Sequence, residues 1–486
     1  MNNSSSRKFP MRFVCVLALV TPPLAAQQLI SPENQLSAPP RLLFVAPSPQ
    51  KHQHPPSSDA QHKSSESMTL EQLKQMALAN NPTLGQAKAG VAAAAGRTRQ
   101  AGLWPNPSVG YTGEEIRGGS YGGGQHGVFV QQNVILGGKL GLDRKAMAEQ
   151  GEQAVAEAEE QRLRVENGVR IAFYQSLAAQ QMVETRKTLS ALAKDAVETT
   201  QQLFNIGQAD QPDLLQAQVE ADEADLAVIA AEQDQQRAWR VLTAAVGKPA
   251  MVLTRLEGNL EDLPQIDPDQ MVETILRDSP AVKIAQLDVT RTELVLARAR
   301  REVIPDLSFR AGYLNNREDV GSIPPKPVGS EGFAEVGLNL RIFNRNQGNI
   351  EAAKADRERA QLEVQRVSLT LRRLAAPLLQ SYSTSRSVIE RFKGRTLPNA
   401  QKAYDLYLSK YHEGAAAYPQ VLIAQRTLFQ LQTSYINALE NAWVNAAALQ
   451  GLLLADPLDL PAAPGELDRP VREINMPVAE TPGAPR

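Results

Sequence analysis

The stretch that decides the fold is FNIGQADQPDLLQAQ, residues 204–218, because the chain returns to it as YHEGAAAYPQVLIAQ, residues 411–425. Gly, Ala, Pro, Leu, Ala and Gln recur in the same order at one constant offset of about 207 residues, the separation of Gly207 from Gly414. Self-similarity at a fixed offset indicates a repeated structural unit. The chain is therefore predicted to be a duplication of one unit.

Earlier landmarks repeat in the same order. NPTL at 81–84 corresponds to SPAV at 279–282, and WPNPS at 104–108 corresponds to IPDLS at 304–308. Each unit opens with an Ala-rich stretch that predicts a helix, from about Thr69 to Leu103 and from about Asp267 to Val303, ended by a proline. These landmarks place the first unit at 69–266 and the second at 267–456.

Two long segments in each unit are nearly free of proline and predict helical rods. The first rods run over Lys139–Phe204 and Gln347–Tyr411, and about 60 residues at 1.5 Å each give on the order of 90 Å. The second rods return over Pro212–Val246 and Pro419–Leu454. Their many alanines favour close packing of helix on helix.

Between the opening helix and the first rod, each unit carries alternating sequence. Leu307, Phe309, Ala311 and Tyr313 alternate with Ser, Arg and Gly, and the returning strand alternates Val336, Leu338, Leu340 and Ile342 with polar residues. A period of two predicts strands, at about 106–135 and 305–342. The pattern fits a membrane barrel with one apolar face, and it also fits a half-buried soluble hairpin.

The N-terminus reads as an export signal over residues 1–26, in which basic residues precede the apolar run Phe13–Val20 and a small-residue cleavage site lies before Gln27. Either Met1 or Met11 is the start. The single cysteine, Cys15, lies inside the signal, so the mature chain has no disulfide and no cysteine lipid anchor. Residues 27–68 form a Pro/Ser/His-rich leader, and residues 457–486 form a Pro-rich tail.

Composition excludes several function classes. The chain has 51 Lys plus Arg, 53 Asp plus Glu and a net charge of −2, which gives no electrostatic reason to expect nucleic acid. The five histidines show no catalytic metal spacing, and no nucleophile and base pair emerges, so we predict no enzyme and no cofactor. His52, His54 and His62 lie in the leader, as a solvated polar tract or as a loose metal site.

After the signal, no apolar run reaches the length of about 18 residues that a spanning helix requires. If the exported chain enters a membrane, closed β-structure is the remaining route, because lipid leaves open strand edges unsatisfied. Four strands are fewer than the roughly eight of the smallest bilayer barrel. Several copies must then share one barrel, and three copies would supply twelve strands.

The order helix, two strands, long helix, tight Gly turn and returning helix resembles the TolC-like outer-membrane factors, over about 68–456. The turns over 204–217 and 411–424 resemble that family's periplasmic helix tips. The resemblance implies a mainly α fold with a small β part: a trimeric 12-stranded outer-membrane β-barrel that continues into a periplasmic α-helical barrel. It also implies partners, namely a periplasmic adaptor (membrane fusion protein), an inner-membrane RND-type pump and outer-membrane lipid.

In that family the tips line the aperture and contact the adaptor. The candidate residues carried over are Gly207, Ala209, Asp210, Pro212, Asp213, Leu214, Leu215, Gly414, Ala416, Pro419, Val421 and Leu422. Repeated threefold, Asp210 and Asp213 would form a cation-attracting ring; the alternative is that they only cap the following helix. The second turn has Ala417 and Gln420 at the aligned positions, which weakens the ring.

A second set of residues marks the strand-to-helix transitions and is similar to the cobalt-zinc-cadmium resistance (CzcC-like) branch. The set comprises Gly137, Gly138, Lys139, Phe343, Asn344, Arg345, Asn346 and Gly348. Gly and Asn permit a sharp change of backbone path, so a structural role competes with a role in selectivity. The branch favours heavy-metal cations as cargo; organic compounds are the second candidate, and a soluble periplasmic coiled-coil scaffold is the rival of another class.

Overall fold

The computed structural model describes residues 67–459, except 115, 117–123, 321–323 and 325, and all of these fall in one compact unit that begins at residue 63. The signal, the leader up to residue 66 with its three histidines, and the tail from residue 460 lie outside the described residues. Predictions made for those segments stay predictions.

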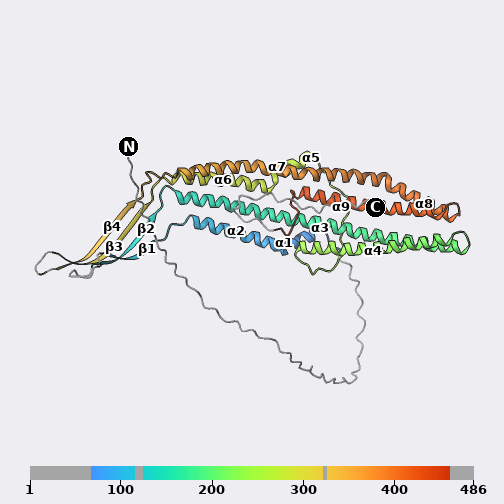
Figure 1. Ribbon diagram of the computed structural model, residues 1–486, viewed down its shortest axis with the longest axis horizontal. Helices are drawn as coiled ribbons and strands as arrows, with labels where there is room; N and C mark the ends of the chain where they lie inside the picture. The colour runs from blue at the N-terminus through green and yellow to red at the C-terminus, as the bar shows by residue number, and fades with distance from the viewer. Residues whose placement is uncertain (1–66, 115, 117–123, 321–323, 325, 460–486) are drawn as a thin grey trace, which may run out of the picture. The chain divides into compact units, whose positions relative to one another are not determined.

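The described chain consists of helices and one small sheet, in the same order twice (Figure 1). The first unit comprises α1 (Leu70–Asn80), α2 (Pro82–Ala101), β1 (Ser108–Glu114), β2 (Gln125–Val134), α3 (Lys139–Asn205) and α4 (Gln211–Val246). The second comprises α5 (Pro268–Asp278), α6 (Pro280–Arg301), β3 (Leu307–Val320), β4 (Lys326–Leu338), α7 (Gln347–Arg391), the π-helix η1 (Phe392–Thr396), α8 (Leu397–His412) and α9 (Tyr418–Gln450). The predicted duplication and the mainly α class are confirmed.

The opening stretch of each unit is two helices, so the prediction of one continuous helix is wrong. Asn81 and Ser279 end the first helix in extended conformation, each directly before a proline at the first position of the next helix. A residue that precedes proline avoids the helical region, because the proline ring collides with its backbone. Asn81 also accepts a hydrogen bond from the Thr83 amide, which fixes the start of α2.

The first rod forms as predicted, since α3 runs for 67 residues without a break. The first rod of the second unit, predicted over Gln347–Tyr411, does not form without a break, because η1 separates α7 from α8. The Leu397 amide donates to the Phe392 carbonyl five residues back, and Pro398 then has no amide hydrogen to donate. Pro377, by contrast, stays inside α7 without a change of helix type.

The four strands form one antiparallel sheet in the order β1-β2-β3-β4, which leaves β1 and β4 as open edges. Val109 pairs with Val130, which pairs with Ala311, which pairs with Ala334. The pairing strand β3 begins at Leu307, opposite Leu338. The predicted strand through Leu340 and Ile342 therefore ends early, because Pro305 and Asp306 lie outside β3 and offer β4 no further partner.

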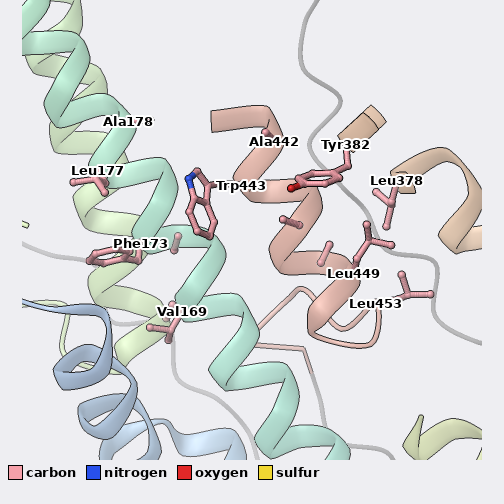
Figure 2. Close-up of a cluster of buried hydrophobic side chains, with 14 of the residues drawn as sticks. Val169, Phe173, Leu177, Ala178, Leu378, Tyr382, Ala442, Trp443, Leu449 and Leu453 are labelled. Atoms are coloured by element: carbon pink, nitrogen blue, oxygen red, sulfur yellow. The ribbon is translucent and has the colours of Figure 1, made fainter. Parts of the chain in front are cut away.

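The main core lies between the rods (Figure 2). Val169, Phe173 and Leu177 of α3 are buried beside α4, while Trp443 and Leu449 of α9 face α3 and α7. The rings of Tyr174 and Trp443 stack with centroids 3.7 Å apart. Within the described residues, no helix carries an apolar stretch of the length that a bilayer crossing needs.

The connection between the units, residues 247–267, which we call the strap, crosses several rods and is hydrogen-bonded to each. Gln180 of α3 accepts from the Leu256 amide at 2.9 Å, and the indole of Trp443 in α9 donates to the Leu260 carbonyl at 2.8 Å. Tyr382 of α7 donates to the Pro264 carbonyl. The strap thus ties α3, α7 and α9 together partway along their length.

Candidate functional site: helix tips and strand–helix junctions

The turn between α3 and α4 is closed by backbone hydrogen bonds and by one left-handed glycine. Gly207 has φ +77, and its amide donates to the Phe204 carbonyl at 3.0 Å. The amide of Gln208 donates to the Leu203 carbonyl at 2.8 Å. A positive φ strains residues that carry a Cβ, so glycine is the residue that this turn requires.

The turn between α8 and α9 has the same bonds at the same offset. Gly414 has φ +69 and donates to the Tyr411 carbonyl at 3.0 Å, and Ala415 donates to the Lys410 carbonyl at 2.8 Å. Pro212 and Pro419 both occupy the second position of the following helix, where a missing amide hydrogen leaves no bond unmade. The sequence repeat is therefore a repeat of backbone geometry, and both tips lie at the end of the helices away from the sheet (Figure 1).

The side chains predicted at the tips divide into an inner and an outer group. Leu214, Val421 and Leu422 are buried, whereas Leu215 is exposed. Asp210, Pro212 and Pro419 are exposed as well, and Ala209, Asp213 and Ala416 are partly buried. The structure thus brings the inner residues together and leaves the others available for contacts outside the chain.

Three tyrosines spaced by seven residues support the second tip, and the sequence analysis missed them. Tyr404, Tyr411 and Tyr418 are buried together with Val421 and Leu428. The Tyr411 hydroxyl donates to Thr200 Oγ1 of α3 at 3.3 Å, which joins the two units. Burial, followed by the nearby Tyr411, Asp213 and Tyr404, raises the pKa of Tyr418 to about 12, so this phenol stays neutral at physiological pH. The heptad spacing was the available signal.

Asp210 occupies the position before the first residue of α4, but its side chain makes no capping hydrogen bond. Asp213 lies in the first turn of α4, where a carboxylate interacts favourably with the helix dipole. The structure therefore shows no capping hydrogen bond from Asp210, and Asp213 is placed to interact with the helix dipole. The placement of these two residues in one chain does not test the predicted threefold acidic ring, which stays a prediction.

At the first strand-to-helix junction, two left-handed glycines turn the chain from β2 into α3. Gly137 has φ +75 and Gly138 has φ +68, and Lys139 follows as the first residue of α3. The Lys139 side chain is buried, and its Nζ lies 2.9 Å from Asp306 Oδ1, which also accepts from the Leu136 amide. The sequence analysis gave Asp306 no role. The first unit has the neutral Asn106 at the aligned position, and this difference between the units was the available signal.

At the second junction, Asn346 performs the same turn with φ 65. Its Nδ2 donates to the Ala299 carbonyl of α6 at 2.9 Å, and its amide donates to Asn344 Oδ1 at 3.1 Å. Arg345 Nε donates to the Ile342 carbonyl at 3.1 Å, and nothing lies near the position of a Cβ on Gly348. Phe343 is almost fully exposed. Most of the junction residues therefore hold backbone, and their predicted role in selectivity stays untested.

Within the described residues, no cluster of three or more His, Cys, Asp or Glu side chains could hold a metal ion. The two regions predicted as functional are a pair of helix turns and a pair of backbone corners. They can position helices and present surfaces.

A sequence model described as outer membrane efflux protein matches residues 73–248 and 271–453. The cobalt-zinc-cadmium resistance protein CzcC of Cupriavidus metallidurans is 27% identical over 392 residues, which cover 79% of this chain and 90% of CzcC. The cation efflux system protein CusC of Escherichia coli is 24% identical over 295 residues, covering 59% of this chain and 62% of CusC. A solved structure of CusC matches with a TM-score of 0.67 at 16% identity, over 84% of this chain and 99% of that chain.

Proposed function

The chain belongs to the outer membrane efflux protein family, and we propose that it forms a passive trimeric conduit for heavy-metal cations in the outer membrane. A periplasmic adaptor and an inner-membrane RND-type pump would deliver the cargo and supply the energy. The chain itself is a channel component of an efflux system, located in the outer membrane with its helical part in the periplasm.

The observation that carries the proposal is the face of the sheet. Val109, Val130, Tyr313, Val336 and Leu338 lie on one face and are each about half exposed or more. A contiguous exposed apolar face marks an interaction with lipid or protein. Because the edges β1 and β4 are open, a single sheet cannot enter lipid without leaving backbone groups unpaired. Three sheets joined edge to edge would remove the open edges.

The end of the sheet that meets the helices carries exposed aromatic and apolar side chains. Trp104 and Phe343 are exposed there, beside Leu340 and Ile342. Aromatic side chains concentrate at membrane–water interfaces, where the ring lies among the headgroups. These exposed side chains support a membrane boundary at the strand–helix junctions. A soluble scaffold would leave both these side chains and the apolar sheet face unexplained.

The cargo class rests on the relatives, since CzcC is a cobalt-zinc-cadmium resistance protein and CusC is a cation efflux system protein. Asp210 at the first tip and Asp222 and Glu223 further along α4 are exposed acids, which are compatible with cations. Organic compounds remain the second candidate, because a conduit passes whatever its pump delivers.

Deletion of the coding sequence tests the cargo. We expect lower tolerance to zinc, cobalt, cadmium or copper, restored by the wild-type chain, with tolerance to dyes and solvents unchanged. The opposite pattern would assign organic cargo to the conduit. Unchanged tolerance in both arms, with pump and adaptor expressed, would contradict an efflux role in that host.

A further inference from the structure

We propose that an exposed basic surface at the strand–helix junctions binds the phosphate groups of anionic phospholipids in the periplasmic leaflet of the outer membrane. The inference rests on the proposed function, because that function places the junctions at the membrane boundary. It adds the class of lipid that the boundary recognises. We call this surface the basic patch; it comprises Arg99, Arg144, Lys145, Arg300, Arg301 and Arg345.

Positive charge is concentrated at the junctions. Residues 98–107, 135–145, 298–306 and 339–348 hold nine basic and three acidic side chains. The chain as a whole is nearly neutral, with 51 Lys plus Arg and 53 Asp plus Glu. The excess of basic side chains is therefore a local feature of the strand–helix junctions.

The acidic residues of these stretches are already paired with basic residues that are buried or partly buried. The pairs are Lys139 with Asp306, Arg298 with Asp143 and Glu302, and Arg341 with Glu302. The six residues of the basic patch are exposed, and none of them forms an ion pair with another residue that the structure describes. Their charge is therefore not compensated within the described part of the chain.

The helix geometry turns exposed cations away from those ion pairs. Lys145 follows Asp143 by two residues in α3, and Arg300 follows Arg298 by two residues in α6. Two residues rotate about 200° around a helix axis. Each of these exposed cations therefore lies on the face of its helix opposite a paired residue, where the junction carboxylates do not reach it.

The two helices that lead into the sheet carry a cation first and an apolar side chain next. After α2, the exposed Trp104 follows Arg99, and after α6, the exposed Ile304 follows Arg300. The strands β1 and β3 begin a few residues later. The apolar side chains thus come between the cations and the sheet.

The two strands that lead back into helices show the reverse order along the chain, which gives the same order relative to the sheet. After β2, the exposed Leu136 precedes Arg144, and after β4, the exposed Phe343 precedes Arg345. Aromatic rings concentrate at membrane–water interfaces, and basic clusters next to a spanning segment attract anionic lipids. The basic patch therefore lies where the headgroup phosphates would be if the sheet crosses the bilayer.

The patch is continuous across several elements. Arg301 of α6 reaches the first junction, because it is bonded to Gly137 between β2 and α3. A Cβ on Gly102 would lie 2.9 Å from Cδ of Arg144, so the stem of this α3 side chain lies against the end of α2. Side chains from α2, α3 and α6 thus form one surface.

Two arginines of the patch are held in place by backbone carbonyls. Arg301 Nη1 donates to the Gly137 carbonyl at 2.9 Å, and Arg345 Nε donates to the Ile342 carbonyl at 3.1 Å. A guanidinium has five N–H donors in a planar fork, so each side chain keeps donors for a ligand. Such a fork matches the oxygens of a phosphate group. The geometry therefore suits a phosphodiester, and the uncompensated charge favours lipids that are anionic.

Lipid retention by the purified trimer tests the basic patch. The full chain is extracted in a neutral detergent and stripped of endogenous lipid. It is then incubated with equal amounts of phosphatidylglycerol and phosphatidylcholine, and unbound lipid is removed by gel filtration. The lipid that remains with the trimer is quantified for each class.

Two variants with the same change of net charge are compared with the wild type. The test variant spares the two carbonyl-bonded arginines and carries four substitutions in the rest of the patch: Arg99→Gln, Arg144→Gln, Lys145→Gln and Arg300→Gln. The matched control removes four exposed cations at and around η1, away from the sheet: Arg391→Gln, Arg395→Gln, Lys402→Gln and Lys410→Gln.

We expect the wild-type trimer to retain several-fold more phosphatidylglycerol than phosphatidylcholine, the control to match it, and the test variant to lose most of the preference. Added NaCl should weaken the preference, because salt screens exposed charges. Inorganic phosphate at the concentration of the lipid should not displace phosphatidylglycerol, because the acyl chains bind the apolar side chains beside the patch. If the test variant fails to assemble, Arg144→Gln with Lys145→Gln carries the test and should lose part of the preference.

Equal retention of the two lipids by a wild-type trimer, or an unchanged preference in the test variant, would overturn the basic patch and leave the proposed function intact. An equal loss in the control would also overturn it, since net charge alone would then explain the effect. Displacement by inorganic phosphate would show a site for a free anion instead of a lipid. A chain that is monomeric and soluble without detergent would overturn the membrane conduit itself, together with the basic patch.

Discussion

At the residue scale, Gly207 and Gly414 have equivalent backbone geometry and equally open surroundings. Both have positive φ, and no atom lies within 4 Å of the position of a Cβ. A substitution there meets strain in the backbone and no steric collision. The left-handed conformation costs roughly 1–2 kcal/mol for a residue with a Cβ, and less for Asn.

We therefore expect Gly207→Val or Gly414→Val to alter the path of the tip, impairing adaptor engagement or gating, while the copies still form trimers. Metal tolerance of the host and the size of the detergent-extracted protein measure the two effects. Gly207→Asn is the control and should keep near-normal tolerance. Full tolerance in both Val variants would contradict the assignment of the tips.

At the element scale, the order of helices and strands could be predicted from the sequence, but the interruptions could not. The rods follow from long stretches without Gly turns or proline. Pro377 and Pro398 show the limit, because one proline stays inside an α-helix and the other follows a π-helix. The π-helix contacts residues that are distant in sequence, since Phe392 packs against Tyr435 of α9 and Lys393 pairs with Glu261 of the strap, and a local pattern does not contain these contacts. The Lys139–Asp306 pair was missed for the same reason: its partners are 167 residues apart.

The strap offers a prediction with a defined pH dependence. Glu261 accepts from Lys393 Nζ at 2.6 Å and from the Tyr435 hydroxyl at 2.9 Å, and these bonds, the Lys393 bond foremost, lower the pKa of Glu261 below its ordinary 4.5. A depressed carboxyl pKa stabilises the fold above the unfolded-state pKa, and the contribution is lost as pH falls through the folded-state value.

Glu261→Gln should therefore lower stability at pH 7 by about 0.5–1 kcal/mol, and the difference from wild type should shrink below about pH 4.5. Thermal unfolding in detergent at pH 7 and at pH 3.5 measures it. Glu257→Gln in the same strap is the control. Glu257 accepts a hydrogen bond from the neutral hydroxyl of Ser67, not from a cation. An equal deficit at both pH values would show that the Lys393 ion pair does not stabilise the strap.

At the scale of the whole molecule, the two faces of the sheet have different surroundings in the proposed conduit. Val128 lies on the apolar face. Thr112 lies on the opposite face and pairs with Gly127, the residue before Val128. A lysine that faces lipid near the middle of a bilayer costs roughly 2–4 kcal/mol, and one that faces the lumen costs much less.

We expect Val128→Lys to reduce the amount of trimer in the outer-membrane fraction several-fold and Thr112→Lys to leave it unchanged. Fractionation and a non-denaturing gel provide the measurement. If both variants insert equally well, the exposed face of the sheet does not contact lipid.

The strap also divides α3 into two arms. It is bonded to α3 at Gln180, and α3 continues for 25 more residues to Asn205, about 37 Å at 1.5 Å per residue. A tilt of about 10° at that fulcrum would carry the end of the rod through on the order of 6 Å. A small angular change at the strap would thereby become a displacement of several ångströms at the tip.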